Sequence, residues 1–272
     1  MKQIAVAVHG ALGKVGREIV AGIPRTPDLS LVGGVDMQAT TDNLIVPGTT
    51  MQLPLYKDLD SLLQNTCPQV IVDFSIYEAA ISAARRALAQ GVNMVIGTTG
   101  ISDKELNELD QLAQKNNAGV VVAPNFALGA VVLMHLAGIA AKFFNNAEII
   151  ELHHNQKTDA PSGTALATAI AMLKSRGKPF VRTPTQKETL PGTRGGQVEG
   201  ITIHSVRLPG LVASEEVIFG GDGQTLTLRH DTVNRECYLP GVIIAIKKVV
   251  NIKGLVFGLE HLLDLGGKNE IV

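Results

Sequence analysis

The stretch Ile4–Gly16, IAVAVHGALGKVG, carries three glycines directly after a short apolar run. The run predicts a strand over Ile4–Val8, and the pattern beyond it predicts a helix over Lys14–Ile23. Small residues in such a strand-to-helix turn let the backbone approach a pyrophosphate, which then accepts hydrogen bonds from free N–H groups at the helix start. The spacing is GxxGxxG rather than GxGxxG, but the same geometry applies.

Asp36 supports a dinucleotide site, because it follows the next apolar run, Leu29–Val35, about 20 residues beyond the third glycine. A carboxylate there accepts hydrogen bonds from the ribose hydroxyls of NAD and repels the 2′-phosphate of NADP. The next residue is Met37 rather than an arginine, although Lys14 could attract a phosphate. A tight turn without a ligand is the weaker alternative. We expect NADH to be the preferred cofactor, with NADPH as the other possibility.

The first 125 residues continue to alternate apolar, β-branched runs with helical patterns. Strands are expected at Val70–Phe74, Val92–Ile96 and Gly119–Val122, and helices at Glu78–Gln90 and Asp103–Lys115. Runs that are apolar on both faces are typical of parallel strands covered by helices. The pattern predicts an α/β fold whose N-terminal part is a Rossmann-type, doubly wound parallel sheet.

Two loops, Gly97–Gly100 and Ala123–Phe126, follow strands at the sheet edge where ligands of open α/β sheets bind. Small and hydroxyl residues there would let the ribose and nicotinamide approach the backbone, and Phe126 is expected to wall the nicotinamide ring. Either loop alone is ordinary loop chemistry, but with the glycine turn they outline one crevice. The residues expected to bind the cofactor are Gly10, Ala11, Leu12, Gly13, Lys14, Val15, Asp36, Gly97, Thr98, Thr99, Ala123, Pro124, Asn125 and Phe126.

After Asn125 the pattern predicts a C-terminal α+β domain with a mixed or antiparallel sheet. The tail is expected to be helical and to pack back on the first domain. We therefore expect a dinucleotide-binding domain over residues 1–126 and 236–272, and a substrate-binding domain over residues 127–235. The predicted elements are helices at Leu128–Phe144, Ser162–Ser175, Gly241–Val250 and Leu255–Leu265, strands at Glu148–His153, Ile201–Arg207, Val212–Phe219 and Thr225–His230, and a loop at Arg176–Gly200.

The composition excludes several classes of protein. Formal net charge is −1 and no Lys/Arg block occurs, so a nucleic-acid partner is not expected. Cys67 and Cys237 lie far apart without metal-ligand spacing, which argues against a disulfide framework and a metal site. No apolar run approaches the ~20 residues of a membrane span. We expect a cytoplasmic protein, or one of the plastid stroma if the source is a plant.

The segment Glu151–Ala165, ELHHNQKTDAPSGTA, concentrates the groups that could do chemistry. Lys157 offers positive charge, and the Ser-Gly-Thr turn at residues 162–164 offers amide and hydroxyl donors at a helix start, which suits a substrate with carboxylates. A histidine beside a lysine can supply a proton during reduction of a C=C or C=N bond. The alternative is a satisfied strand histidine, His153, and a solvated lysine. Zinc is disfavoured because a third ligand is missing at a usual spacing.

This segment resembles the signature of the dihydrodipicolinate reductase family, and the resemblance extends over essentially the whole chain. Supporting pieces are the glycine turn, VDFS at 72–75, IGTTG at 96–100, APNF at 123–126, and Arg235. The resemblance implies hydride transfer from NAD(P)H to a cyclic dicarboxylate imine, giving tetrahydrodipicolinate in diaminopimelate and lysine synthesis. It also implies domain closure and a homotetramer formed through second-domain sheets. By the same resemblance, the catalytic residues are His153 and Lys157, with Lys157 the proton donor, and the substrate carboxylates are held by His154, Gly163 and Thr164.

The chain departs from the family pattern at four places. His9 replaces a small residue, Met37 and Ile76 stand where many members carry basic residues for the 2′-phosphate, and Ala213–Glu215 replaces Gly-Glu-His. Two other functions stay open: another two-domain NAD(P)-dependent dehydrogenase of aspartate-derived metabolites, and a non-catalytic NAD(H)-sensing protein. The first of these needs a cysteine nucleophile in its phosphorylating form, and neither cysteine lies in a suitable place.

Overall fold

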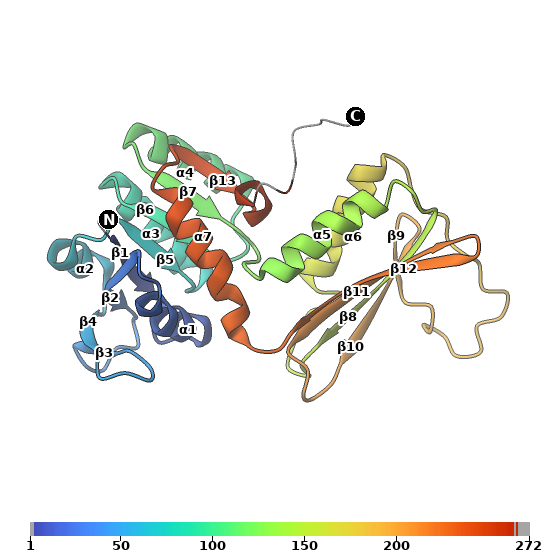
Figure 1. The fold of residues 1–272 in the computed structure, drawn as a ribbon, viewed down its shortest axis with the longest axis horizontal. Coiled ribbons are helices and arrows are strands. Elements are labelled where there is room, and N and C mark those ends of the chain that lie inside the picture. Colours follow the sequence, from blue (N-terminus) through green and yellow to red (C-terminus); the bar gives the residue numbers. More distant parts are fainter. Residues whose placement is uncertain (1–2, 264, 266–272) are drawn as a thin grey trace. The chain divides into compact units, whose positions relative to one another are not determined.

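The computed structural model describes residues 3–263 and residue 265. The chain divides into two compact units, one formed by Met1–Ala127 with Arg235–Val272 and the other by Leu128–Asn234. The boundaries expected from the sequence differ from these by one residue at each junction. Each unit is described by itself below (Figure 1).

Unit 1 is built on a sheet with the strand order β13-β7-β6-β5-β1-β2-β4-β3. Its neighbouring strands pair in parallel except for the antiparallel β3–β4 pair at one edge. This confirms the predicted parallel, doubly wound sheet. The strands are β1 (Ile4–His9), β2 (Leu29–Val35), β3 (Asn43–Ile45), β4 (Gln52–Tyr56), β5 (Val70–Asp73), β6 (Asn93–Ile96), β7 (Gly119–Val122) and β13 (Gly254–Phe257).

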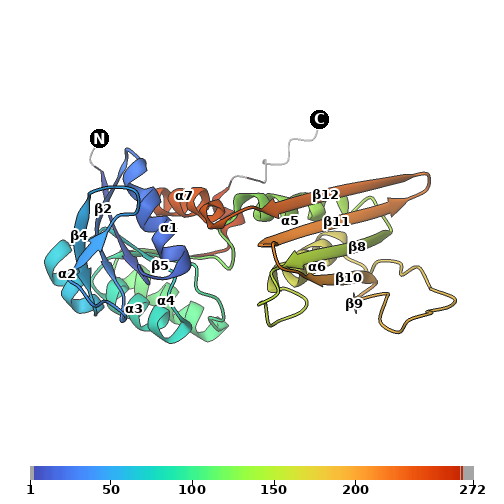
Figure 2. The same ribbon diagram turned by 90° about the horizontal axis from the view of Figure 1, so that it is seen from below.

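Helices cover both faces of this sheet (Figure 2). Helices α1 (Lys14–Gly22) and α7 (Leu239–Val249) pack together, and α2 (Leu59–Thr66), α3 (Tyr77–Ala89) and α4 (Asp103–Lys115) pack in a row on the other side. Short 3-10 turns, η1 (Ile23–Arg25), η2 (Arg235–Tyr238) and η3 (Leu259–Leu262), complete the unit. Because helices lie on both sides, every residue of β5 and of β7 is buried.

The sheet order changes direction at β1, since the chain proceeds to β2 on one side and later to β5 on the other. Open α/β sheets bind ligands outside the carboxyl ends of the strands at such a switch point. The glycine turn follows β1, Asp36 follows β2, and the loops at residues 97–100 and 123–126 follow β6 and β7. The predicted cofactor residues therefore gather at one edge of unit 1.

The predicted helix over Leu255–Leu265 is wrong within the described residues, and residue 264 lies outside them. Residues Gly254–Phe257 form β13, which pairs in parallel with β7, and η3 follows. A short apolar run does not reveal its secondary structure through periodicity alone. The two glycines that bound the strand were nevertheless visible in the sequence. Gly254 and Gly258 adopt φ values of +93° and +91° at its two ends.

Unit 2 packs α5 (Leu128–Ala140) and α6 (Gly163–Arg176) on one face of a five-stranded sheet of order β12-β11-β8-β10-β9. The β8–β10 pair is parallel and the other pairs are antiparallel, which confirms the predicted mixed sheet. The strands are β8 (Asn146–His153), β9 (Gly196–Val198), β10 (Ile201–Arg207), β11 (Ala213–Gly221) and β12 (Gln224–Thr232).

Three local predictions need correction. The helix expected to reach Phe144 ends at Ala140. The loop expected over Arg176–Gly200 contains β9, whose three residues are too few to show alternation. The elements β3, β4 and α2 were not predicted. For β4 the reason is Pro54, because Pro argues against a strand except at an edge or a bulge.

Gly119, the first residue of β7, shows how tightly the C-terminal segment is built into unit 1. A Cβ at Gly119 would lie 2.3 Å from the Val249 carbonyl oxygen and 2.8 Å from the Ile252 carbonyl oxygen. Both atoms belong to backbone that cannot move cheaply. We expect Gly119→Ala to lower the free energy of unfolding by about 1–3 kcal/mol in urea titrations.

The control is Gly220→Ala, where the nearest atom to the added Cβ is 3.8 Å away, on Asn146. This substitution should change the free energy of unfolding by less than about 0.5 kcal/mol. Equal effects of the two substitutions would contradict the close approach.

Candidate active site

The glycine turn of unit 1 packs so closely against neighbouring backbone that a side chain at Gly10 or Gly16 would clash with it. Gly10 has φ +78°, and a Cβ there would lie 2.9 Å from the Phe74 carbonyl oxygen. A Cβ at Gly16 would lie 2.0 Å from the Gly10 carbonyl oxygen. Gly13 is the N-cap of α1 and contributes no side-chain hydrogen bond to the helix start. The first N–H groups of α1, which include those of Lys14 and Val15, are thus suited to an anion.

Asp36 lies beside this turn. Its Oδ2 accepts a hydrogen bond from the Leu12 N–H at 2.9 Å, and its Oδ1 accepts one from the Gln38 N–H at 2.9 Å. The carboxylate is therefore fixed between the end of β2 and the glycine turn. Met37 follows it with 75% of its surface exposed.

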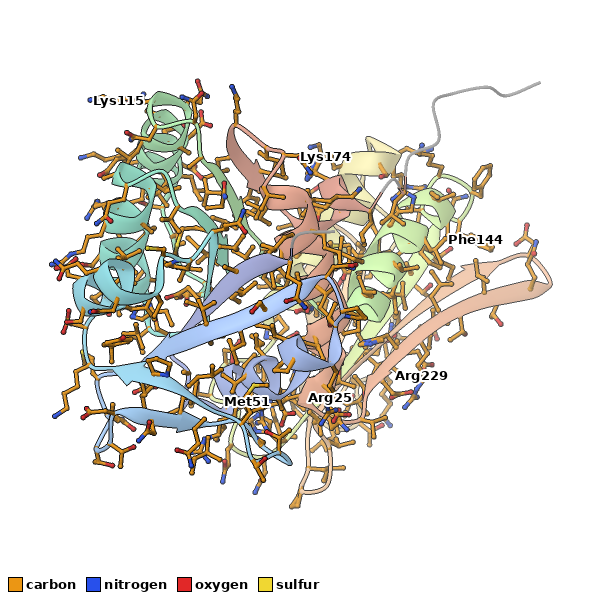
Figure 3. All side chains as sticks on the ribbon, turned by 60° about the vertical axis from the view of Figure 1, so that its left-hand side comes forward. Arg25, Met51, Lys115, Phe144, Lys174 and Arg229 are labelled. Carbon is orange, nitrogen blue, oxygen red and sulfur yellow. The ribbon has the colours of Figure 1, made fainter. Side chains whose placement is uncertain are left out.

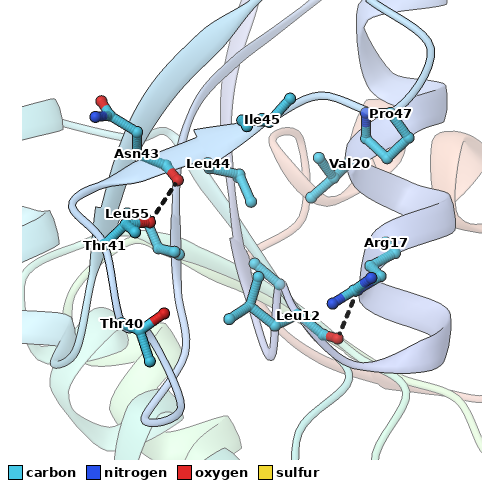
Figure 4. Close-up of a pocket in the computed structure, with 11 residues that line it drawn as sticks. Leu12, Arg17, Val20, Thr40, Thr41, Asn43, Leu44, Ile45, Pro47 and Leu55 are labelled. Carbon is cyan, nitrogen blue, oxygen red and sulfur yellow. Dashed lines mark hydrogen bonds between the residues drawn. The ribbon is translucent and has the colours of Figure 1, made fainter.

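A hollow of about 330 Å³ lies next to the glycine turn in unit 1. Two predicted cofactor residues, Ala11 and Leu12, contribute to its lining (Figure 4). The Arg17 Nε donates to the Leu12 carbonyl oxygen at 2.9 Å, so the arginine side chain is held at the rim. The volume lies within the range of small-molecule sites.

A fully buried carboxylate, Asp73, joins the ends of three strands. It accepts hydrogen bonds from the Thr98 hydroxyl at 2.7 Å and the Ser75 hydroxyl at 2.8 Å, and it contacts Nδ1 of His9. Sequence reasoning quoted Asp73 but gave it no role. The available signal was a carboxylate that directly follows three buried apolar residues of one strand.

The other predicted cofactor residues differ in how open they are. Gly97 packs against Phe74, and Thr99 and Pro124 are exposed, whereas Ala123 is buried. The Asn125 Oδ1 accepts a hydrogen bond from the Ala127 N–H at 2.9 Å.

Within unit 1 the Phe126 ring is buried, and its expected contact with the nicotinamide ring remains a prediction. The side chain is 1% exposed and packs on Phe74, with 5.6 Å between ring centroids. Phe126 is part of the core beneath the loop, because the apolar ring gains more from burial than from exposure to solvent.

In unit 2 the site is organised by Glu151, whose side chain is 0% exposed. Its carboxylate accepts two hydrogen bonds from Arg207, at 2.9 and 2.7 Å, one from the Ser162 N–H at 3.2 Å, and contacts His153 Nδ1 at 2.5 Å. Burial acts to raise the pKa of Glu151, but the hydrogen bonds from Arg207, Ser205 and His153 outweigh it and lower the pKa. Glu151 is therefore an anion at neutral pH.

His153 is held by Glu151 through Nδ1, which leaves Nε2 as the nitrogen for a ligand. Burial lowers the pKa of His153, and the opposing effect of Glu151 only partly offsets it. The imidazole is thus mainly neutral at pH 7, with its proton on Nδ1.

Lys157 pairs with Asp159, with 2.7 Å between Nζ and Oδ1. The hydrogen bond from Lys157 lowers the pKa of the Asp159 carboxyl. The Asp159 carbonyl oxygen accepts a hydrogen bond from Arg207 at 2.7 Å, so the same guanidinium supports both Glu151 and the loop that carries Lys157.

The start of α6 is open to a ligand. Ser162 is its N-cap and accepts a hydrogen bond from the Ala165 N–H at 3.1 Å. The first helical residues are Gly163 and Thr164, and no heavy atom lies within 4 Å of a Cβ built at Gly163. His154 contributes a buried Nδ1 that has no hydrogen-bond partner among the described residues. Free N–H groups at the start of a helix suit an anionic group.

The structure thus brings the predicted residues 153, 154, 157, 163 and 164 together where β8 ends and α6 begins. Sequence reasoning gave no role to Glu151 or Asp159, although both lie in the segment Glu151–Ala165, and it did not connect Arg207 or the buried Glu215 with this region. Within residues 3–263 and 265 no group of three or more His, Cys, Asp or Glu side chains could hold a metal ion. Over the same residues, no helix is both long and apolar enough to cross a membrane.

Comparison with known proteins identifies the family. Residues 4–126 match the family model described as dihydrodipicolinate reductase, N-terminus, and residues 129–263 match that described as dihydrodipicolinate reductase, C-terminus. The chain belongs to the dihydrodipicolinate reductase family. The resemblance inferred from the Glu151–Ala165 segment is confirmed.

Relatives within this family are similar over nearly their full length. The chain is 51% identical over 265 residues to the 4-hydroxy-tetrahydrodipicolinate reductase of Dehalococcoides mccartyi, covering 97% of this chain and 100% of that protein. It is 49% identical to that of Moorella thermoacetica, covering 96% and 98%. The dipicolinate-bound dihydrodipicolinate reductase of Paenisporosarcina sp. TG-14 has a TM-score of 0.86 and 42% identity, covering 96% of this chain and 100% of that one.

The buried Glu151–Arg207 pair gives a stability prediction. Removing the carboxylate leaves a largely buried guanidinium without its counter-charge. We expect Glu151→Ala to lower the free energy of unfolding by about 3 kcal/mol, the lower end of the range for buried pairs, because the Arg207 side chain keeps 20% exposure.

The matched control is Glu216→Ala on the same sheet. Glu216 pairs with Arg229 of β12, whose side chain is 49% exposed (Figure 3), so its loss should cost less than about 1 kcal/mol. Similar losses for the two variants in urea titrations would show that the buried pair is not special.

Proposed function

We propose that this protein reduces 4-hydroxy-tetrahydrodipicolinate to tetrahydrodipicolinate with electrons from a nicotinamide cofactor. Members of its family are NAD(P)H-dependent oxidoreductases of diaminopimelate and lysine biosynthesis. The observation that carries the proposal is the end of β8, where His153, Lys157 and the open start of α6 lie together. A dicarboxylate with a reducible ring fits a site that offers a proton donor and anion-binding groups.

The residues of unit 1 fit a dinucleotide. The open N-terminus of α1 and the backbone approach at Gly10 and Gly16 suit the pyrophosphate, and Asp36 suits a ribose with free hydroxyls. When bound, the cofactor supplies the hydride. The remaining cofactor contacts proposed are those at the ends of β6 and β7, at residues 97–99 and 123–126, with Phe126 acting through its backbone.

In unit 2 we assign the proton to Lys157 and the orientation of the reacting ring to His153. The 4-hydroxyl must leave the ring as water for tetrahydrodipicolinate to form. The lysine ammonium exchanges its contact with Asp159 for the substrate and gives its proton to the dehydrated ring as that ring accepts the hydride. His153, with Nδ1 turned to Glu151, offers Nε2 as an acceptor. His154, Gly163 and Thr164 hold the substrate carboxylates. We also infer a homotetramer formed through the second-unit sheets, which light scattering would test.

The direct test couples the protein to the synthase that makes the substrate from pyruvate and aspartate semialdehyde. Loss of absorbance at the nicotinamide band should require both the synthase and this protein. If NADH binds in titration calorimetry but no oxidation follows, the chain is a cofactor-binding sensor or acts on another carbonyl compound.

The two proposed catalytic residues give the first kinetic prediction. His153→Ala and Lys157→Ala should each lower kcat about 10²–10⁴-fold, because each removes a group that acts in the transition state. His261→Ala and Lys174→Ala are the controls, since both side chains are exposed and lie outside the site. Near-normal turnover in the first two variants would exclude these roles.

The preference for NADH over NADPH gives the second kinetic prediction. We expect a higher kcat/KM with NADH than with NADPH, because Asp36 pairs with ribose hydroxyls and repels a 2′-phosphate. Asp36→Ala should lower kcat/KM for NADH about tenfold or more, and Met37→Arg should raise kcat/KM for NADPH. Met37→Gln, which adds polarity without charge, is the control. A wild-type protein that prefers NADPH would contradict the assignment.

A further inference from the structure

A second carboxyl group, Glu215, lies next to Glu151 in unit 2 and has no role in the chemistry above. Glu215 of β11 is register-paired with Glu151 of β8 on one side and with His230 of β12 on the other. Paired residues of neighbouring antiparallel strands project to the same face, with Cβ atoms about 5 Å apart. Glu215 is 5% exposed and Glu151 is 0% exposed, whereas His230 is partly buried.

The hydrogen-bond donors beside this row, the Arg207 guanidinium and the neutral His153 ring, contact only one of its two carboxyl groups. Arg207 and His153 are both bound by Glu151. Burial lowers the pKa of His230, so this imidazole is neutral at pH 7. Its ring packs against α5, because a Cβ at Gly129 would lie 2.3 Å from His230 Cδ2.

The helices that cover the row add no charge to balance Glu215. Helix α5 contains no Asp, Glu, Lys or Arg, and His135 is its one ionisable side chain. The basic residues of α6, Lys174 and Arg176, belong to its last turn. The group of α6 that acts on the pKa of Glu215 is the hydroxyl of the fully buried Thr168, whose Oγ1 has no hydrogen bond of normal geometry among the described residues.

Two carboxylates at paired positions with one guanidinium cannot both be anions at low cost. Burial and the charge of Glu151 together raise the pKa of Glu215 to about 7, against the opposing effect of Thr168. Atom Oε1 of Glu215 is buried and has no hydrogen-bond partner among the described residues. A neutral acid tolerates this environment, whereas an anion does not.

We propose that Glu215 is a positioning residue which, as the neutral acid, preserves the Glu151–His153 arrangement and whose ionisation disturbs it. This inference rests on the role proposed for His153. Loss of the Glu215 proton places a second negative charge beside Glu151, and the two carboxylates then compete for Arg207. His153 loses its fixed orientation, so kcat falls while substrate binding through α6 is retained.

The direction of the pH dependence follows from the pH at which Glu215 loses its proton. An acid whose pKa is raised in the folded protein is neutral below that value and ionised above it. The working form of the site is therefore present on the acid side of pH 7 and is lost as pH rises. For wild type, kcat should fall about tenfold per pH unit well above the pKa, and KM for the substrate should change little.

The experiment compares Glu215→Gln with wild type over pH 6–9 in the synthase-coupled assay. The amide cannot ionise and has nearly the same shape, so kcat of the variant should lose the alkaline fall. The control is Glu216→Gln, which faces the other side of the sheet and should keep the wild-type profile. An alkaline fall that survives Glu215→Gln unchanged belongs to another group and overturns the proposal.

Two measurements on the free protein keep this test separate from that of the reductase activity. In wild type, the infrared band of a protonated carboxyl should vanish as pH passes 7, and the His153 ring resonance should show an inflection at the same pH. Both signals should be absent in Glu215→Gln, and Glu215→Met serves if the amide variant folds poorly. A Glu215 that is already ionised at pH 6 refutes the proposal even if turnover is normal.

Discussion

Unit 2 depends on the burial of one carboxylate. Removing the charge of Glu151 from water costs several kcal/mol, and only directed donors can repay it. The donors come from three places in the chain: Arg207 on β10, His153 on β8 itself, and the Ser162 N–H at the start of α6. Satisfying a single anion therefore fixes the end of the sheet against the helix that follows. The same contacts set the tautomer of His153, so stability and chemistry share one interaction.

Unit 1 also has a buried, hydrogen-bonded carboxylate at the edge of its sheet. Asp73 is fully buried where β5 ends, and its partners come from the ends of β1 and β6 and from the adjacent Ser75. A parallel sheet has no hairpins to tie the carboxyl ends of its strands together. The hydrogen bonds of Asp73 link these strand ends, next to the close contact between the backbones of Gly10 and Phe74. These contacts hold the edge that we propose for the cofactor in place without a ligand, and such preorganisation lowers the entropic cost of binding.

The parts of the fold that could be predicted from the sequence were those with a local cause. The turn after β1 needs glycine at fixed offsets. The start of α4 is likewise readable from the sequence, because Ser102 followed three residues later by Glu105 is a capping-box pattern, and the structure forms that capping box. The parts that could not be predicted depend on distant partners. Arg207 is 56 residues from Glu151, and nothing in its surroundings in the chain announces the contact. The strand β13 likewise exists because β7 offers it an edge, not because Leu255–Phe257 alternates.

The structure explains the departures from the family pattern to different degrees. His9 is explained by Asp73, since an imidazole at the end of β1 gains a buried acceptor that a small residue would leave to Thr98 and Ser75. Met37 contacts little, so its significance lies in the charge that it lacks. Glu215 is different, because placing a second carboxyl group beside Glu151 has an energetic cost that apolar packing would avoid. Glu215 differs from the residues around it in one property, because its raised pKa lets the carboxyl group keep its proton near neutral pH. Strongly perturbed pKa values cluster at functional sites, which is why we connect the energetic cost of burying Glu215 with a function.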